Sequence, residues 1–125
     1  MRGQDIIGGC TLCHNNPNVG NHSTSLPINI GVTMANLIDD DGDRNTATGA
    51  SVEVTNPGKA MISGKWTDIG KTKGPILRGL AARAPYFHNG SAADLKTVVK
   101  FYNQRFDIGL SSRQVSDLVA FPSAL

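Results

Sequence analysis

The clearest hydrophobic pattern lies in the C-terminal third of the chain. Between residues 92 and 106, apolar side chains recur at the spacing i, i+3, i+4 and i+7, which places them on one face of a helix. These positions are Leu95, Val98, Val99 and Tyr102. The pattern predicts a helix that buries this face and leaves its lysines in solvent.

A second helix is predicted after residue 110. Ser111 and Gln114 have the spacing of a capping box, in which each side chain bonds the backbone of the other residue. Pro122 limits the helix to about three turns. Its inward face consists of Val115, Leu118 and Val119.

The segment from residue 15 to residue 74 has little helical periodicity and is rich in Gly, Asn, Asp, Thr and Pro. Short strands are predicted at Ile28–Val32 and Ser51–Val54, and a turn at residues 56–58. Loops this long in a small domain are typical of a chain that wraps a bound group. A length of 125 residues predicts a single domain over residues 1–125.

The composition supports a bound group and gives no reason to expect nucleic acid or a membrane span. Hydrophobic residues make up 39% of the chain and aromatic residues 6%, which is a thin supply for a core of protein side chains alone. A buried apolar cofactor would add the missing bulk. A net charge of +2 gives no reason to expect nucleic-acid binding. No window approaches the roughly 20 apolar residues of a membrane span.

Cys10, Cys13 and His14 form the pattern C-x-x-C-H, which is the attachment signal of haem c. Two thiols three positions apart on a turn can reach the two vinyl groups at one porphyrin edge. The histidine that follows presents its imidazole to the iron as the proximal ligand. The sequence therefore predicts one covalent haem c, which moves single electrons between Fe(III) and Fe(II).

Two other interpretations of the cysteines fit less well. A redox dithiol requires a βαβ context, which this sequence lacks. A structural zinc site needs four ligands, and only His22 and His88 remain as nitrogen donors. Because haem is attached outside the cytoplasm, a periplasmic or secreted protein is expected. The first nine residues have no long apolar region of a signal peptide, so a leader is expected to have preceded Met1.

Three stretches carry a family resemblance: GPILRGL from Gly74, APYFHNG from Ala84, and the helix from Leu95 to Tyr102. In this order they resemble the C-terminal haem domain of bacterial di-haem cytochrome c peroxidases and MauG-like proteins. The resemblance implies the all-α cytochrome c fold, with short helices and long loops around one haem. Those enzymes need two haems, whereas this chain has a single C-x-x-C-H, so peroxidase activity does not follow directly.

The resemblance also bears on the sixth iron ligand. At the position of Tyr102 the peroxidases have a ligating methionine and the MauG-like proteins a ligating tyrosine. A tyrosinate would stabilise ferric iron and lower the reduction potential. The alternative is that Tyr102 is a core aromatic with its hydroxyl at the haem edge.

Met61 is the main rival, because its segment is bounded by glycines and a thioether would raise the potential. A methionine, however, more often fills a gap in a core. Met34, His22 and His88 are weaker candidates; the family motif favours His88 as a turn residue near the porphyrin. An iron without a sixth ligand could meet peroxide or bind a small gas.

Supporting residues are expected around the haem. The Pro75 carbonyl is a candidate acceptor for the second N–H of His14. Arg78 is expected to pair with a haem propionate, and otherwise to be a solvated charge. Trp66 is expected either to bond a propionate or to cover the haem face.

The chain contains a basic cluster, which suggests an acidic partner, and an acidic cluster, which is only a weak indication of a cation site. Six basic residues against only Asp68 lie between residues 59 and 83, and a basic rim would attract acidic redox partners. They are Lys59, Lys65, Lys71, Lys73, Arg78 and Arg83. A scattered, solvated set is the alternative. The acidic run at residues 39–43 lacks the spacing of a calcium loop and is expected to be solvated.

The leading functional hypothesis is therefore electron transfer by a haem c protein. The runner-up is the haem domain of a peroxidase-like or MauG-like enzyme that acts on hydrogen peroxide. No general acid–base pair is evident in the sequence to support the enzyme. A gas binder is the third class, and a five-coordinate iron would distinguish it.

Overall fold

The computed structural model describes residues 10, 13–14, 23–32, 54 and 56–124, and the backbone at 43–44 and 51–52. The chain divides into two compact units. The terminal unit comprises Met1–Ser25 and Gly74–Leu125, and the central unit comprises Leu26–Lys73. The expectation of a single domain over residues 1–125 stays a prediction.

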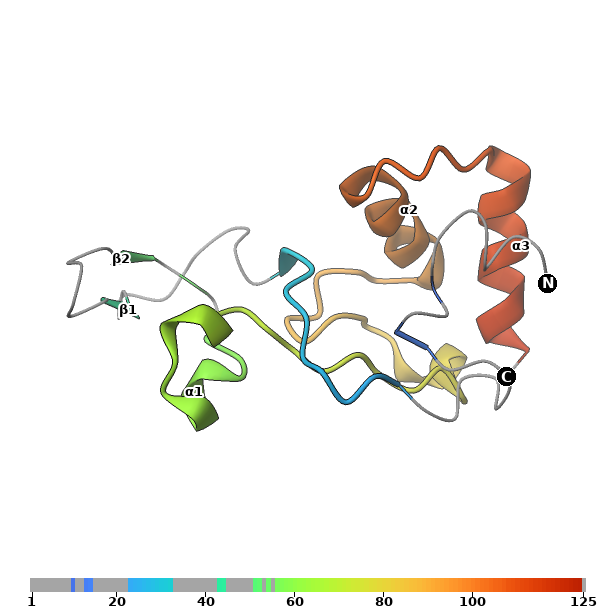
Figure 1. Ribbon diagram of the computed structural model, residues 1–125. Helices are drawn as coiled ribbons and strands as arrows, with labels where there is room; N and C mark the ends of the chain where they lie inside the picture. The colour runs from blue at the N-terminus through green and yellow to red at the C-terminus, as the bar shows by residue number, and fades with distance from the viewer. Residues whose placement is uncertain are drawn as a thin grey trace. The chain divides into compact units, whose positions relative to one another are not determined.

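The first predicted helix is confirmed in the terminal unit as α2, Leu95–Arg105 (Figure 1). Asp94 caps it, because its carboxylate accepts a hydrogen bond from the Thr97 backbone N–H at 2.7 Å. This bond lowers the pKa of Asp94. Leu95 is buried and Tyr102 is half-buried, so the helix turns the predicted face inward.

The last helix is α3, Ser112–Ser123, and its predicted capping box is present. Gln114 N–H donates to Ser111 Oγ at 3.4 Å, and Ser111 N–H donates to Gln114 Oε1 at 2.8 Å. Val115 is buried on its inner side. Pro122 lies in the last turn, where the helix ends one residue later, so the predicted length of about three turns is confirmed.

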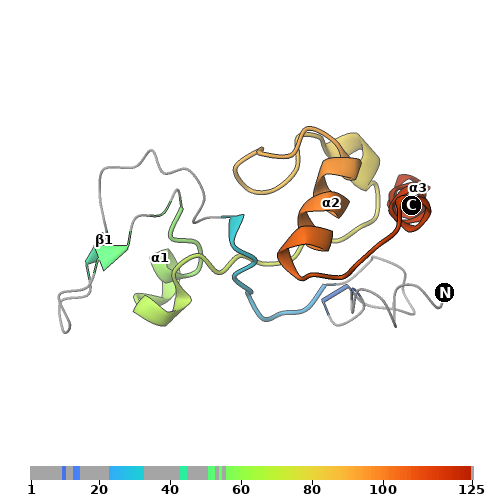
Figure 2. The same ribbon diagram turned by 90° about the horizontal axis from the view of Figure 1, so that it is seen from above.

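The core of the terminal unit forms between these helices and η5, the 3₁₀ helix Leu80–Arg83. Tyr86 is 8% exposed and its hydroxyl donates to the Leu80 carbonyl at 3.1 Å. Its backbone pairs with that of fully buried Ala92, which closes the loop between them. α3 packs on both α2 and η5, and it is seen nearly end-on in Figure 2 while α2 runs across the view. The two helices therefore cross steeply.

The central unit has little regular structure. The strand β1, Asp43–Arg44, pairs antiparallel with β2, Ser51–Val52, which occupies the first half of the predicted strand at Ser51–Val54. Two short helices follow, α1 at Ala60–Ser63 and the 3₁₀ helix η4 at Trp66–Asp68.

The predicted strand over Ile28–Val32 is wrong, because in the structure this segment forms only a single bridge. Ile28 pairs with Thr72 through two backbone hydrogen bonds of 2.9 and 3.1 Å, and the pairing extends no further.

The all-α prediction holds in its coarse form, since the described elements are helical apart from the pair β1–β2. None of the helices in the described ranges is long and apolar enough to cross a membrane.

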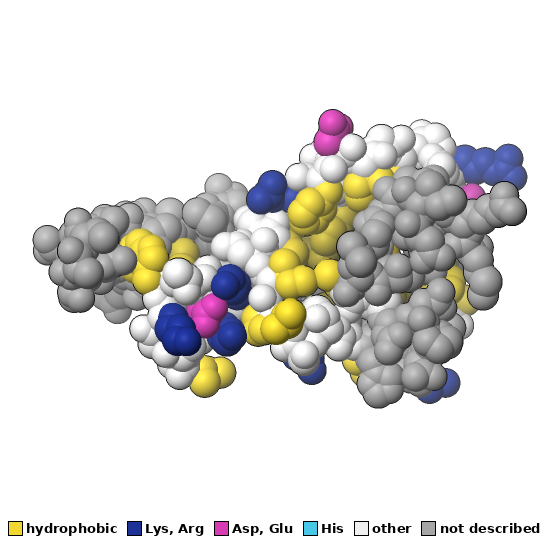
Figure 3. All heavy atoms as spheres, in the orientation of Figure 1, with side chains coloured by type: hydrophobic (Ala, Val, Ile, Leu, Met, Phe, Trp, Pro, Cys, Tyr) yellow, Lys and Arg dark blue, Asp and Glu magenta, His cyan; other side chains and the backbone are white. Residues whose placement is uncertain are grey.

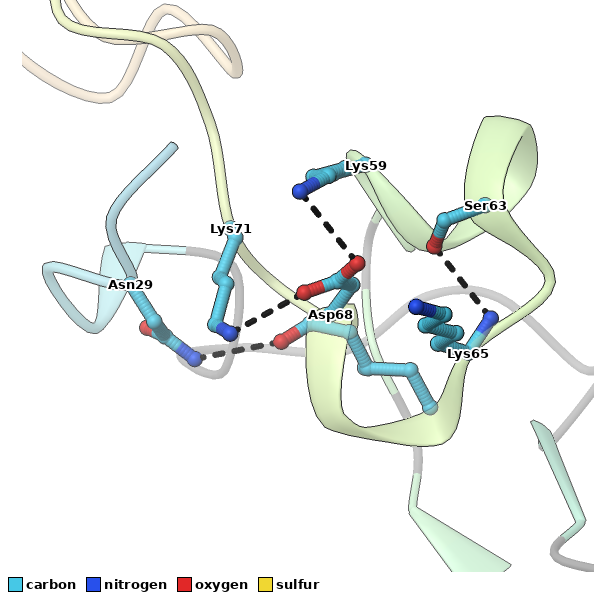
Figure 4. A network of polar contacts seen from close by, with 7 residues as sticks. Asn29, Lys59, Ser63, Lys65, Asp68 and Lys71 are labelled. Carbon is cyan, nitrogen blue, oxygen red and sulfur yellow. Dashed lines mark hydrogen bonds and ion pairs between the residues drawn. The ribbon is translucent and has the colours of Figure 1, made fainter. Parts of the chain in front are cut away.

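A buried carboxylate holds the central unit together (Figure 4). Asp68 is 7% exposed and accepts a hydrogen bond from Lys71 Nζ at 3.0 Å, with Lys59 Nζ at 3.5 Å from its other oxygen. The Lys71 bond, followed by one from Ser63, lowers the pKa of Asp68 to about 2. These contacts join α1, η4 and the segment after η4.

The predicted turn at residues 56–58 is confirmed beside this network. Asn56 Oδ1 accepts a hydrogen bond from Gly58 N–H at 2.7 Å, and Gly58 has φ +62°. A Cβ at Gly58 would collide with the backbone carbonyl of Lys71. Gly58 is therefore needed for its backbone conformation and for this close approach.

We predict that Gly58→Ala destabilises the protein more than Gly64→Ala. Gly64 has φ +64° but nothing within 4 Å of the position that an alanine methyl group would occupy, so it controls for the left-handed backbone alone. The difference should be about 1–3 kcal/mol, because the Lys71 backbone must move to accept the methyl group. Urea unfolding of the two variants measures it. Equal losses would contradict the close approach.

The low pKa of Asp68 predicts a pH-dependent stability. Because the folded pKa of about 2 lies below the unfolded value, the stabilisation is complete above about pH 4 and is lost as pH falls toward 2. Asp68→Asn should therefore flatten the dependence of the melting temperature on pH in this window. Asp117→Asn, which removes an exposed carboxylate of α3, controls for the lost charge. Equal slopes in the wild type and Asp68→Asn would contradict the prediction.

Candidate functional site

The C-x-x-C-H segment lies on one turn of the terminal unit. The Cys10 carbonyl accepts hydrogen bonds from Cys13 N–H at 3.2 Å and from His14 N–H at 2.8 Å. Both cysteines are half-buried, and they are not joined in a disulfide. The turn thus places two free thiols and an imidazole within five consecutive residues.

Two neighbouring segments hold this turn. Thr24 N–H donates to the Cys13 carbonyl at 2.8 Å, and His14 pairs with Ser23 as an isolated antiparallel bridge. On the other side lies Gly74, where a Cβ would sit 3.8 Å from His14 Cε1 and 3.9 Å from Ser23 Cβ. The His14 ring is therefore bordered by the segment around Ser23 and by the start of the GPILRGL stretch.

The surroundings of His14 favour a neutral imidazole. Burial lowers its pKa, and an interaction with the Pro75 backbone opposes this shift. The neutral ring is the form that binds a metal ion. His14 Nδ1 is buried and has no hydrogen bond of full geometry within the described part of the chain. The interaction with the Pro75 backbone raises the pKa of His14, as expected of a hydrogen-bond acceptor. That the Pro75 carbonyl accepts the second N–H of His14 stays a prediction.

Tyr102 extends from α2 toward the same region. Burial raises the pKa of its phenol, and the thiols of Cys13 and Cys10 raise it further. Because both thiols contribute, the phenol lies within electrostatic reach of Cys10 and Cys13. The two cysteines come about ninety positions earlier in the sequence. The structure brings Tyr102 and the C-x-x-C-H turn together.

A group of phenylalanines surrounds Tyr102, and sequence reasoning missed it. The Tyr102 ring stacks on Phe106 with centroids 5.9 Å apart and meets Phe101 edge-on at 5.6 Å. Phe87 completes the group, with its centroid 6.3 Å from that of Tyr102. The i, i+4 spacing of Tyr102 and Phe106 was the available signal. A core aromatic and an iron ligand are both compatible with this setting.

The group reaches the surface at the end of α2. Phe106 is 52% exposed, and the Arg105 guanidinium lies 5.6 Å from its ring centroid. Figure 3 shows hydrophobic side chains at the surface over α2. Arg78 is exposed in the same unit, as is His88, which lies in the turn between Tyr86 and Ala92.

Other candidates belong to the central unit or lie outside the described residues. Met61 is 73% exposed on α1, and Trp66 is half-buried in η4. His22, Met34 and residues 39–42 fall outside the described ranges. Where the structure is described, no cluster of three or more His, Cys, Asp and Glu side chains is placed to bind a metal ion.

The six basic residues are divided between the units. Two of them, Lys59 and Lys71, pair with Asp68 in the central unit, which also contains Lys65 and Lys73. Arg78 and Arg83 lie in the terminal unit.

Comparison with curated proteins identifies relatives that match most of this chain. The cytochrome c peroxidase IdrP2 of Denitromonas iodatirespirans is 36% identical over 94% of this chain. The chain is related to the cytochrome c peroxidases and MauG. The cytochrome c551 peroxidase of Nitrosomonas europaea is 30% identical over 94% of the chain, and MauG of Methylophilus methylotrophus is 39% identical over 42%. No family model and no solved structure matches.

Kinship with the cytochrome c peroxidases implies a haem c cofactor and a haem-based redox function. The chain spans about a third of the length of these peroxidases, 36% of the Denitromonas protein and 30% of the Nitrosomonas protein. The residues present fit such a cofactor. Two free thiols lie on one turn, the adjacent imidazole is biased toward its neutral form, and the half-buried phenol of Tyr102 belongs to the same unit.

Proposed function

We propose that this chain is an electron-transfer protein with one haem c, attached through Cys10 and Cys13. His14 is the proximal iron ligand. The observation that carries the proposal is the single turn closed by the Cys10 carbonyl, which carries two free thiols and an imidazole whose pKa is lowered by burial. When bound, the haem supplies an iron that accepts and releases one electron.

The chain's own residues hold and orient this group. Each thiol forms a thioether with one vinyl group, so the cofactor is retained without a large protein core. His14 would offer Nε2 to the iron, and the Pro75 backbone interacts with the same ring. Arg78, exposed in the same unit, pairs with a propionate through its planar guanidinium. The fold proposed for this arrangement is the cytochrome c fold.

Tyr102 is the proposed distal ligand, with Met61 as the alternative. Tyr102 lies in the same unit as His14 and within electrostatic reach of both cysteines. Because burial raises the pKa of its phenol, the side chain is neutral without a metal, and ionisation requires the charge of ferric iron. The ferric state is then the one that Tyr102 stabilises.

The proposed partners are other redox proteins with an acidic docking face. The six basic residues between residues 59 and 83 supply charge of the complementary sign, and long-range attraction of this kind raises association rates. Nucleic acid is not proposed as a partner. Covalent attachment of haem places the protein in the periplasm or outside the cell.

A peroxidase-like activity is the second candidate, favoured by the names of the relatives. It requires an iron with an open position at which hydrogen peroxide binds. The sixth coordination position of the iron is open in a peroxidase and occupied in the proposed electron carrier. The ferric absorption spectrum therefore distinguishes the two functions.

The purified holoprotein tests the function directly. Haem should remain on the polypeptide after denaturation, and the ferrous protein should pass its electron to an oxidised c-type cytochrome much faster than it consumes peroxide. Haem that is lost on denaturation would overturn covalent attachment. Rapid peroxide turnover by the isolated chain would favour the enzyme.

Tyr102→Phe should convert the ferric spectrum toward high spin and raise the reduction potential, because the anionic oxygen ligand is lost. Met61→Leu is the matched control and should change neither property. The ferric spectrum, extended into the near-infrared, is the measurement. A methionine-to-iron band that disappears in Met61→Leu, or an unchanged spectrum in Tyr102→Phe, would contradict ligation by Tyr102.

A further inference from the structure

Two buried polar atoms beside the C-x-x-C-H turn have no hydrogen-bond partner within the described residues. They are His14 Nδ1 and Ser23 Oγ. Leaving such groups unsatisfied is costly, typically ~1–3 kcal/mol each, so buried polar atoms are normally paired. Both atoms belong to residues that oppose each other in a backbone bridge, so one explanation can account for both.

The backbone brings these two residues together from different segments. His14 and Ser23 face each other as an antiparallel bridge, and the neighbouring bond from Thr24 N–H to the Cys13 carbonyl measures 2.8 Å. Residues that oppose each other in such a bridge have their Cβ atoms roughly 5 Å apart. Both side chains also border the same point, since a Cβ at Gly74 would lie within 4 Å of each.

The chemistry of the two atoms is complementary. When Nε2 of His14 is committed to a metal, Nδ1 carries the proton and is a donor. A serine hydroxyl is both donor and acceptor, and it rotates to suit its neighbour. The Pro75 backbone acts on the same ring, but its interaction leaves Nδ1 without a hydrogen bond of full geometry.

We propose that Ser23 is a positioning residue for His14, whose hydroxyl oxygen accepts a hydrogen bond from the Nδ1 proton once Nε2 binds iron. The proposal rests on the proposed function, because it requires His14 to be the proximal ligand. Ser23 and the Pro75 backbone then both restrict the orientation of the His14 ring. An acceptor at Nδ1 makes the imidazole a stronger donor to the metal and so favours the ferric state.

Ser23→Ala in the holoprotein tests this role. Removal of the acceptor should raise the reduction potential, so that the Fe(III) to Fe(II) ratio at a fixed solution potential falls by about fivefold, the effect of one typical net hydrogen bond. Ser23→Thr keeps the hydroxyl and should retain the wild-type ratio. Ser25→Ala is the matched control, because Ser25 is exposed two positions further on and should leave the ratio unchanged.

The outcomes separate this inference from the proposed function. If the wild type carries covalent haem and Ser23→Ala leaves the ratio unchanged, the role of Ser23 is wrong while the function stands. If the wild type carries no covalent haem, the proposed function itself fails. Should Ser23→Ala not accumulate as folded holoprotein, Ser23→Gly removes the hydroxyl without adding bulk, and an unchanged ratio in that variant overturns the proposal. Loss of the wild-type ratio in Ser23→Thr would also overturn it.

Discussion

The carbonyl of Cys10 accepts two backbone hydrogen bonds, and every candidate ligand arrangement in this protein depends on the turn that they close. A turn of five residues has no core of its own, so it must be held from outside. Ser23 and Thr24 hold one side through backbone pairing, and Gly74 lies against the imidazole on the other. His14 is thus held by contacts with segments that lie some fifty positions apart in the sequence.

The two C-terminal helices, α2 and α3, hold the second candidate ligand, Tyr102, in the terminal unit. Asp94 sets the start of α2, and Leu95 anchors it in the core with Leu80 and Tyr86. Tyr102 follows two turns later on the same face. Because α3 packs against α2, the position of Tyr102 is set by tertiary packing as well as by helix geometry.

Local signals made part of this structure predictable. The helices follow from apolar spacing and from the capping box at Ser111, which lie within a few residues of the feature that they define. The strand expected at Ile28–Val32 failed because its partner Thr72 offers only one pair of bonds, which no local pattern reveals. Counting charges likewise missed that Asp68 pairs with two of the six basic residues.

In the candidate site too, residues that are adjacent in the sequence could be predicted, whereas residues that only the fold brings together could not. Cys10, Cys13 and His14 are adjacent in sequence, so their common chemistry is visible as a motif. Ser23 carries no signal of its own and becomes a candidate only because the fold places it opposite His14. The Phe87 ring beside Tyr102 is likewise brought there by a loop rather than by the helix period.

The setting of Tyr102 bears on the choice between electron carrier and peroxidase. Cleavage of peroxide needs a positioned group that accepts and returns a proton. The described rings around Tyr102 belong to Phe87, Phe101 and Phe106, none of which exchanges protons. Electron transfer and peroxide cleavage place different requirements on this region. An electron carrier needs a sixth ligand that stays bound to the iron, whereas a peroxidase needs an open position with a proton-exchanging group beside it.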